Sequence, residues 1–193
     1  MDDAWLPVDD TPLLLERLAA LLQQSVREDA ARHGLLPIHL QVLAYLARAN
    51  RYSDRPIAVA EYFGITRGTV SQTLAVLERR GLVARQPDER DGKHLHLALT
   101  AAGRAVLARG WTRRLDAALR AAGAQADIGE RLRALLTALQ RQNGNRAFGV
   151  CRQCAHFLPA GDGHLCGLTG EPLAREQTRK ICREWTAPEP AAA

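Results

Sequence analysis

The sequence is poor in aromatic residues and has no long apolar run. Phe, Trp and Tyr make up 5% of its 193 residues, whereas alanine, leucine and arginine dominate, a composition that favours helices. No segment approaches the ~18 consecutive apolar residues that span a membrane. The first ten residues, MDDAWLPVDD, are acidic where a secretory signal requires a basic region. We therefore expect a cytoplasmic protein that contacts no membrane.

A catalytic constellation is also missing from the sequence. Ser71 has no histidine or aspartate context that would make it a nucleophile, and there is no glycine-rich phosphate loop. His94 and His96 alternate along a predicted strand, so at most one of them faces any given pocket. We therefore do not expect an enzyme.

Positive charge is in excess, but only in one part of the chain. The formal net charge is +5, and residues 147–193 hold five Lys/Arg and five Asp/Glu, so the whole excess belongs to residues 1–146. A basic surface permits an acidic partner such as nucleic acid.

Residues 57–100 have the element order of a winged helix-turn-helix. A short helix is expected to end at Gly64, which can adopt a left-handed conformation, and Thr66 can cap the next helix. Val70, Leu74 and Leu77 recur at i, i+4 and i+7, so they are expected to face the core. The second helix then presents its other face outward.

That outward face carries short or hydrogen-bonding side chains, as a helix in a DNA major groove requires. Arg67 and Gln72 are our choices for base edges, because they are long and offer paired hydrogen-bonding groups. The DNA-contacting residues expected on residues 66–80 are Thr66, Arg67, Thr69, Ser71, Gln72 and Thr73.

A basic hairpin follows this helix. Leu82, Val83 and Arg85 alternate as a strand, Asp91-Gly92 is a hairpin turn signal, and residues 94–100 alternate again as the returning strand. Arg90 and Lys93 lie at the predicted tip, where we expect them to contact phosphates.

The run LAVLERRGLVARQPDERDGKHLHLALTAAG resembles the MarR family of bacterial winged-helix regulators. The resemblance covers roughly residues 11–142 and implies double-stranded DNA as the partner. The family's wing usually reads Asp-x-Arg-Asp-x-Arg. Here Asp88, Arg90 and Asp91 match, whereas Lys93 replaces the last arginine and offers a point charge in place of a two-pronged donor.

Long amphipathic helices are expected on both sides of the winged helix. Pro12 opens one that runs to about Arg32 with a leucine-rich stripe, and two more are expected at about 101–122 and 127–142. Their apolar stripes must be covered, and a homodimer is the most economical cover. Two symmetric recognition helices imply a near-palindromic operator.

All four cysteines lie in the last 43 residues, from Cys151 on. Cys151, Cys154, Cys166 and Cys182 are spaced C-x2-C-x11-C-x15-C, and structural disulfides are uncommon in a cytoplasmic protein. We therefore expect these residues to ligate a metal centre. The apolar residues expected to shield it are Phe157, Leu165, Leu168, Leu173, Ile181 and Trp185.

The spacing leaves the metal open. A zinc ribbon usually supplies two Cys-x-x-Cys pairs, whereas irregularly spaced thiolates suit an iron–sulfur cluster at least as well. Phe157 after the pair and Trp185 after the last cysteine resemble the cluster segment of high-potential iron–sulfur proteins. An iron–sulfur cluster of the [4Fe-4S] type is favoured, with Zn²⁺ as the alternative.

These observations predict a mainly α fold with a small β wing. Residues 1–146 would form a winged-helix DNA-binding and dimerisation domain with its DNA-binding core at 37–100, and residues 147–193 a four-cysteine appendage. The leading hypothesis is a homodimeric transcriptional repressor whose centre senses redox state, oxygen or metal supply. One alternative is the same regulator with a structural zinc tail and a small-molecule effector. Another is an electron-transfer protein that uses the helix-turn-helix as a scaffold.

Overall fold

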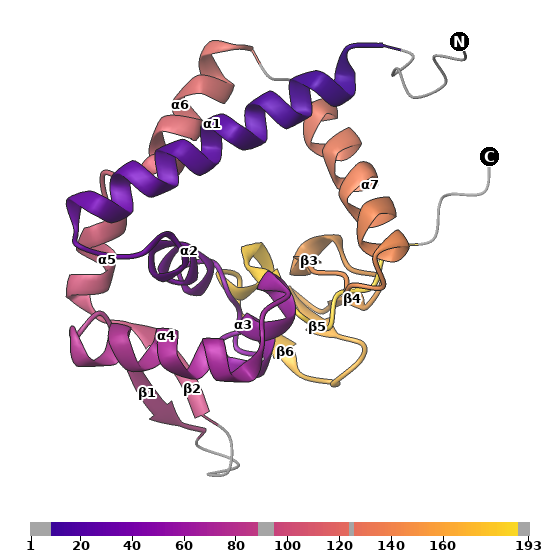
Figure 1. Ribbon diagram of the computed structural model, residues 1–193. Coiled ribbons are helices and arrows are strands. Elements are labelled where there is room, and N and C mark those ends of the chain that lie inside the picture. The colour runs from indigo at the N-terminus through magenta and orange to yellow at the C-terminus, as the bar shows by residue number, and fades with distance from the viewer. Residues whose placement is uncertain (1–8, 89–94, 124–125, 189–193) are drawn as a thin grey trace.

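The computed structural model describes residues 9–88, 95–123 and 126–188 (Figure 1). Its α-helices are α1 (Thr11–Arg32), α2 (Pro37–Leu46), α3 (Pro56–Phe63), α4 (Arg67–Arg79), α5 (Ala101–Leu107), α6 (Trp111–Ala121) and α7 (Ala126–Gln142). The strands are β1 (Val83–Pro87), β2 (Leu95–Leu99), β3 (Gly149–Val150), β4 (Phe157–Ala160), β5 (Gly163–Cys166), β6 (Pro172–Leu173) and β7 (Ile181–Cys182). Two short 3-10 helices are η1 (Cys151–Gln153) and η2 (Gln177–Arg179). No helix in these ranges is both long and apolar enough to cross a membrane.

Helices α2, α3 and α4 with strands β1 and β2 form the winged helix-turn-helix. Gly64 ends α3 with a φ of 62°, a left-handed conformation that costs glycine little, and the Thr66 hydroxyl accepts a hydrogen bond from the Thr69 N–H at 3.1 Å at the start of α4. Strands β1 and β2 pair antiparallel, with Val83 opposite Leu99. The predicted helix-turn-helix and strand pair are therefore confirmed, whereas the predicted turn at Asp91-Gly92 lies outside the described residues. The largest fully buried apolar side chains are Leu40, Leu43, Tyr45, Leu74 and Leu77.

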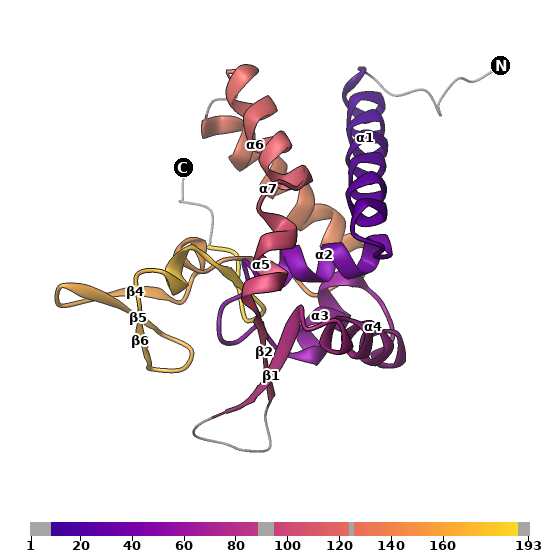
Figure 2. The same ribbon diagram turned by 90° about the vertical axis from the view of Figure 1, so that its left-hand side faces the viewer.

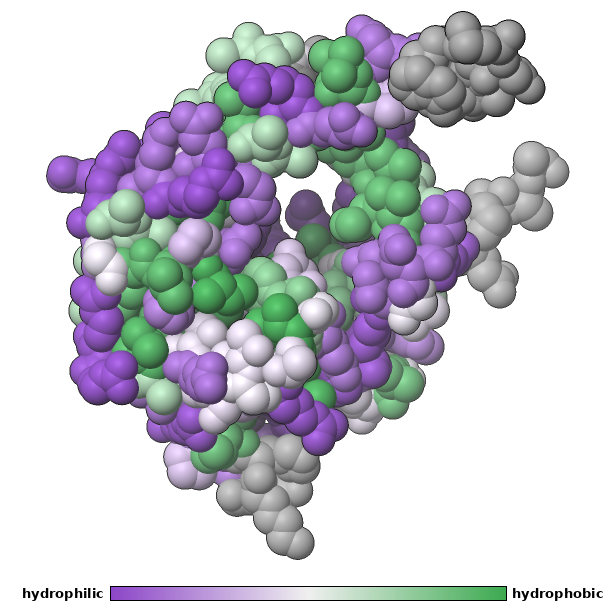
Figure 3. All heavy atoms as spheres, in the orientation of Figure 1, coloured by the Kyte–Doolittle hydropathy of each residue, from purple (hydrophilic) through white to green (hydrophobic). Residues whose placement is uncertain are grey.

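Helices α1, α6 and α7 stand above this unit and enclose an opening, which is visible in the space-filling view between α1 and α7 (Figures 1 and 3). Apolar residues border the opening on the α7 side (Figure 3). The first predicted helix has the bounds of α1, and the last one matches α7. The side view separates these helices from the wing, which lies at the opposite end of the molecule (Figure 2).

The single helix expected at about 101–122 is wrong in one respect, because the structure divides it into α5 and α6. Gly110 is the last residue before α6 and has an extended backbone, and glycine is a poor helix former. The break lets Leu107 and Trp111 both pack against the winged-helix core. Helix α6 then leaves the core, and none of its residues is buried.

Residues 147–188, here called the tail, form two small sheets. Strands β3 and β7 pair antiparallel with Gly149 opposite Cys182, and β5 lies between β4 and β6 with Cys166 opposite Phe157. A second apolar core contains Cys151, Leu173, Cys182 and Trp185, with Phe157 packed against it. Two expected members of this core lie elsewhere: Leu168 is 52% exposed, and Ile181 packs on the winged-helix core.

The tail is attached to the loop between α2 and α3, residues 47–55, which we call the α2–α3 loop. The Ile181 N–H donates to the Arg48 carbonyl at 2.7 Å, and the Asn50 N–H donates to the Ile181 carbonyl at 2.9 Å. The Arg51 guanidinium pairs with Glu171 at 2.5 Å. The tail therefore contacts the winged helix directly through the α2–α3 loop, and not only through its chain connection to α7.

Candidate DNA-reading face and cysteine centre

Helix α4 presents most of the predicted DNA-contacting side chains to solvent. Arg67, Thr69, Ser71 and Gln72 are exposed, as is Thr66 at its cap. Arg67 and Ser71 also line a hollow next to α3 and β1, together with Arg85. This face is polar and free of bulky apolar groups, which is compatible with entry into a groove.

Thr73 does not belong to this face. It is 4% exposed and lies on the core side of α4, because positions 70, 73, 74 and 77 recur at helical spacing. Its hydroxyl cannot reach a DNA groove from there. The prediction of Thr73 as a contact residue is therefore corrected to a core position.

The base of the wing is held by a charged cluster on the α2–α3 loop. The His96 imidazole on β2 lies 2.6 Å from Asp54 through Nδ1 and 2.9 Å from Asp88 through Nε2, and Arg55 pairs with Asp88 at 3.3 Å. Burial lowers the pKa of His96, but the hydrogen bonds to the two carboxylates outweigh it, so the pKa is raised. Arg90 and Lys93, predicted to contact phosphates, lie outside the described residues.

The four cysteines line one small cavity in the tail. Cys151 and Cys182 are buried, Cys154 and Cys166 are half-buried, and all four are free thiols. Tyr52 of the α2–α3 loop lines the same cavity, and its hydroxyl donates to Glu171 at 2.5 Å. The other apolar lining residues are Phe157 and Leu173. The four predicted ligands therefore lie around one cavity, and the metal centre itself stays a prediction.

Several donors point at the sulfur atoms. The Thr186 N–H donates to the Cys154 sulfur at 3.4 Å, and the Asn50 side chain and the Glu184 backbone donate to Cys182. Burial and then the neighbouring thiols raise the pKa of Cys151 to about 12. Burial raises the pKa of Cys182 as well. Without a cation, both therefore remain protonated at neutral pH.

The donor chemistry of the cavity fits a thiolate-bound metal centre. Four cysteine sulfurs with N–H donors around them are the ligand set of zinc or of an iron–sulfur cluster. Within the described ranges, however, no group of three or more His, Cys, Asp or Glu side chains is placed as it would be around a single metal ion.

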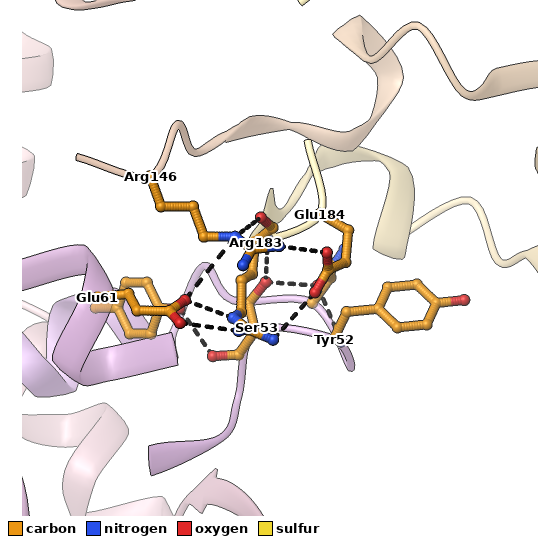
Figure 4. A network of polar contacts seen from close by, with 8 residues as sticks. Tyr52, Ser53, Glu61, Arg146, Arg183 and Glu184 are labelled. Carbon is orange, nitrogen blue, oxygen red and sulfur yellow. Dashed lines mark hydrogen bonds and ion pairs between the residues drawn. The ribbon is translucent and has the colours of Figure 1, made fainter. Parts of the chain in front are cut away.

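Close to the cysteines, an ion-pair network joins the tail to α3 (Figure 4). The Arg183 guanidinium donates to both carboxylate oxygens of Glu61, at 2.5 and 2.9 Å, and the Arg183 N–H donates to the Ser53 hydroxyl at 2.8 Å. Arg146 pairs with Glu184 at 2.6 Å and lies 3.9 Å from Glu61. The tail, α3 and the α2–α3 loop thus meet at one polar junction, which is formed by Ser53, Glu61, Arg146, Arg183 and Glu184.

The residues of this junction carry no local signal in the sequence. Asn50, Tyr52 and Ser53 are expected only as part of a polar loop, and Glu61 only as part of a short helix. A contact between Glu61 and Arg183 joins residues 122 positions apart, and no period or turn motif encodes it. Only homologous sequences in which these positions covary would have indicated it.

The comparisons with known proteins cover the winged helix and, for the solved structures, about two thirds of the chain. Residues 33–94 match the MarR family. CouR from Rhodococcus jostii RHA1, solved with p-coumaroyl-CoA, is 25% identical with a TM-score of 0.54, covering 68% of this chain and 92% of CouR. The S. aureus MepR–DNA complex is 20% identical with a TM-score of 0.51, covering 68% and 97%. A comparison with curated proteins gave no match.

These likenesses confirm the winged helix-turn-helix fold, and residues 33–94 resemble the MarR family as the sequence predicted. A third structure, a MarR-family transcriptional regulator from Rhodococcus sp. RHA1, is 24% identical with a TM-score of 0.50, covering 69% of this chain and 94% of that one. The family match ends before α5 and does not reach the cysteines. The family match therefore carries no information about the tail.

Proposed function

We propose that this chain, with its MarR-type winged helix, is a homodimeric, sequence-specific DNA-binding transcriptional repressor whose tail senses redox state, oxygen or metal supply. The observation that carries the proposal is the convergence of four free cysteines on a cavity closed by Tyr52, a residue of the DNA-binding unit. A centre built in this way is in contact with the loop that supports both α3 and the wing.

The proposed partner is double-stranded DNA with a near-palindromic sequence. The exposed polar face of α4 supports insertion into a major groove, with Arg67 and Gln72 reading bases. Arg90 and Lys93 are proposed to hold phosphates beside it. MepR, which shares this fold, has been solved as a DNA complex.

Dimerisation is supported by the apolar surface of the upper helices. Four leucines of α1 are 43–62% exposed, and five residues of α7 are 39–50% exposed. A soluble monomer rarely leaves such a contiguous stripe in water. The residues are Leu13, Leu14, Leu18 and Leu21 on α1, and Ile128, Leu132, Leu135, Leu136 and Leu139 on α7.

An iron–sulfur cluster is favoured over a single zinc ion as the bound centre. A zinc ribbon usually supplies two Cys-x-x-Cys pairs. The spacing C-x2-C-x11-C-x15-C has one such pair and two isolated cysteines, which suits an iron–sulfur cluster at least as well, and all four cysteines line one cavity. Cys151, Cys154, Cys166 and Cys182 would hold the cluster, which would supply electron transfer or oxygen sensitivity.

Purification of the full chain without air tests the nature of the centre. We expect a brown protein with about four irons and four sulfides per chain. A colourless protein with one zinc per chain would reject the cluster. Sedimentation and footprinting test the rest, since a monomer that protects one asymmetric half-site contradicts the proposed dimer and operator.

A small-molecule effector is the second candidate, in which zinc would serve only to fold the tail. A hollow between α1 and α5–α6 is lined by Asp29, Arg32, His33 and Arg109, and Asp29 Oδ2 is buried without a hydrogen-bond partner among the described residues. CouR has been solved with an acyl-CoA ligand. An effector that releases DNA from a zinc-loaded protein in air would favour this function.

A further inference from the structure

Glu61 lies where the tail meets the helix-turn-helix. It is a residue of α3, and its carboxylate accepts two hydrogen bonds from Arg183. The hydrogen bond from Arg183 is the largest cause that lowers the pKa of Glu61, and the charges of Arg183, Arg146 and Arg67 lower it further. Glu61 is therefore a carboxylate with three arginines in its field.

One of these arginines is the predicted base reader. Glu61 and Arg67 line the same hollow beside the turn between α3 and α4, together with Arg146. Arg67 is exposed, and no ion pair holds it within the described part of the chain. In the arrangement seen here, Arg183 occupies both oxygens of Glu61, so Arg67 remains available for DNA.

Arg183 is adjacent in the chain to the cysteine centre. It directly follows Cys182, and its N–H is fixed on the Ser53 hydroxyl. Ile181, on the other side of Cys182, is hydrogen-bonded to the α2–α3 loop in both directions. A displacement of Cys182 would therefore move a short segment whose other end carries the guanidinium that binds Glu61.

We propose that Arg183 and Arg67 compete for Glu61, and that this exchange transmits the state of the cysteine centre to DNA binding. With the centre assembled, Arg183 neutralises Glu61 and Arg67 reads DNA. With the centre lost, Glu61 pairs with Arg67 and withdraws it from the groove, while a bare carboxylate faces the phosphates. Arg183 is thus a positioning residue, and the loaded protein is the form that binds DNA tightly.

This inference rests on the proposed function, and a set of variants separates the two. The probe is a duplex selected from random-sequence DNA by the loaded wild-type protein. Affinity is measured without air at fixed salt for the full-length wild type, Arg183→Ala, Glu61→Gln, the double variant, and Arg179→Ala as a control. Arg179 is an exposed tail arginine without an ion pair in the described residues. Metal content and helix content are recorded for each protein.

Arg183→Ala should lower the affinity of the loaded protein about tenfold, a typical coupling between sites. Glu61→Gln should bind as tightly as wild type. Adding Glu61→Gln to Arg183→Ala should restore affinity to within about twofold, because the carboxylate that captures Arg67 is gone. Removing the centre should weaken wild type but not Glu61→Gln.

A merely structural role for Arg183 predicts a different result, since the double variant would then be at least as weak as Arg183→Ala. That outcome, or equal weakening by Arg179→Ala, would overturn the exchange. If loaded and unloaded wild type bind equally, the sensor function fails, whereas restoration by the second substitution in loaded protein still supports the exchange. If the Arg183→Ala protein does not retain the centre, the test is the DNA affinity of Glu61→Gln after its centre is removed. The exchange requires that affinity to stay as high as in the loaded protein, and a fall equal to that of wild type would overturn it.

Discussion

Gly149→Ala should damage the cysteine centre through a steric clash. A Cβ at this position would lie 2.4 Å from two ring carbons of Trp185 and 2.6 Å from its ring nitrogen. The indole cannot move aside freely, because its N–H donates to the Gln153 carbonyl at 2.7 Å. Gly149 also lies opposite Cys182 in the β3–β7 pair, so a shift of the strand displaces a proposed ligand.

Two responses to the clash have different costs. Expelling the indole would expose ~150–250 Å² of aromatic surface, or roughly 4–6 kcal/mol at about 25 cal/mol per Å². Shifting the backbone of β3 costs about 1–3 kcal/mol, as overpacked cores generally do. Because shifting the backbone costs less free energy than expelling the indole, we expect β3 to move.

The measurement is metal and sulfide content after anaerobic purification, together with protease resistance of the tail. Gly163→Ala is the matched control, because it lies in the same tail and the nearest atom to its Cβ would be 3.9 Å away. We expect the control to retain the centre and Gly149→Ala to lose most of it. Wild-type metal content and protease resistance in Gly149→Ala would refute the packing argument.

Four further variants test the other parts of the molecule. Arg67→Ala should change the preferred DNA sequence and reduce the binding free energy on the best site by about 1–3 kcal/mol. Lys93→Ala should weaken binding to all sequences alike and reduce the dependence of log affinity on log salt concentration by about one unit. Binding isotherms measure both effects. Leu132→Glu with Leu136→Glu should shift sedimentation from dimer to monomer, because charges would replace apolar residues in the proposed interface. Because the pKa of His96 is raised in the folded protein, the charged imidazole stabilises the fold. This stabilisation is complete below about pH 6.5, the ordinary pKa of histidine, and is lost as the pH rises through the pKa of the folded state. The Tm of the His96→Gln variant should therefore fall less than that of wild type when the pH is raised from about 6.5 to 8.5. An equal fall in Tm for both proteins would contradict the stabilising role of charged His96.

The winged helix was predictable because its signals are local. Helical spacing of Val70, Leu74 and Leu77, a glycine turn and a capping threonine each act within a few residues. The same helical periodicity places Thr73 on the core side of α4. Its polar side chain suggested a DNA contact, but its position in the helix decides that it is buried. The break at Gly110 was missed because an apolar stripe continues across it, and only packing against the core decides where the helix bends.

The cysteine centre was only half predictable. The spacing of the four cysteines indicates a shared site, but the partners that close it come from the α2–α3 loop, about a hundred residues earlier. In the sequence, the tail is connected to the DNA-binding unit only through the predicted helix that ends at about residue 142. The contacts of Arg183 with Glu61 and Ser53 offer a more direct route, and such polar contacts between distant segments leave no periodic pattern in the sequence.

The most direct test of the account is the DNA affinity of one wild-type preparation before and after its centre is removed without air, on the selected duplex at fixed salt. The account predicts iron and sulfide in the first sample and an affinity lower by roughly 5–150-fold in the second. Equal affinities, with the second sample shown to be metal-free, would contradict it.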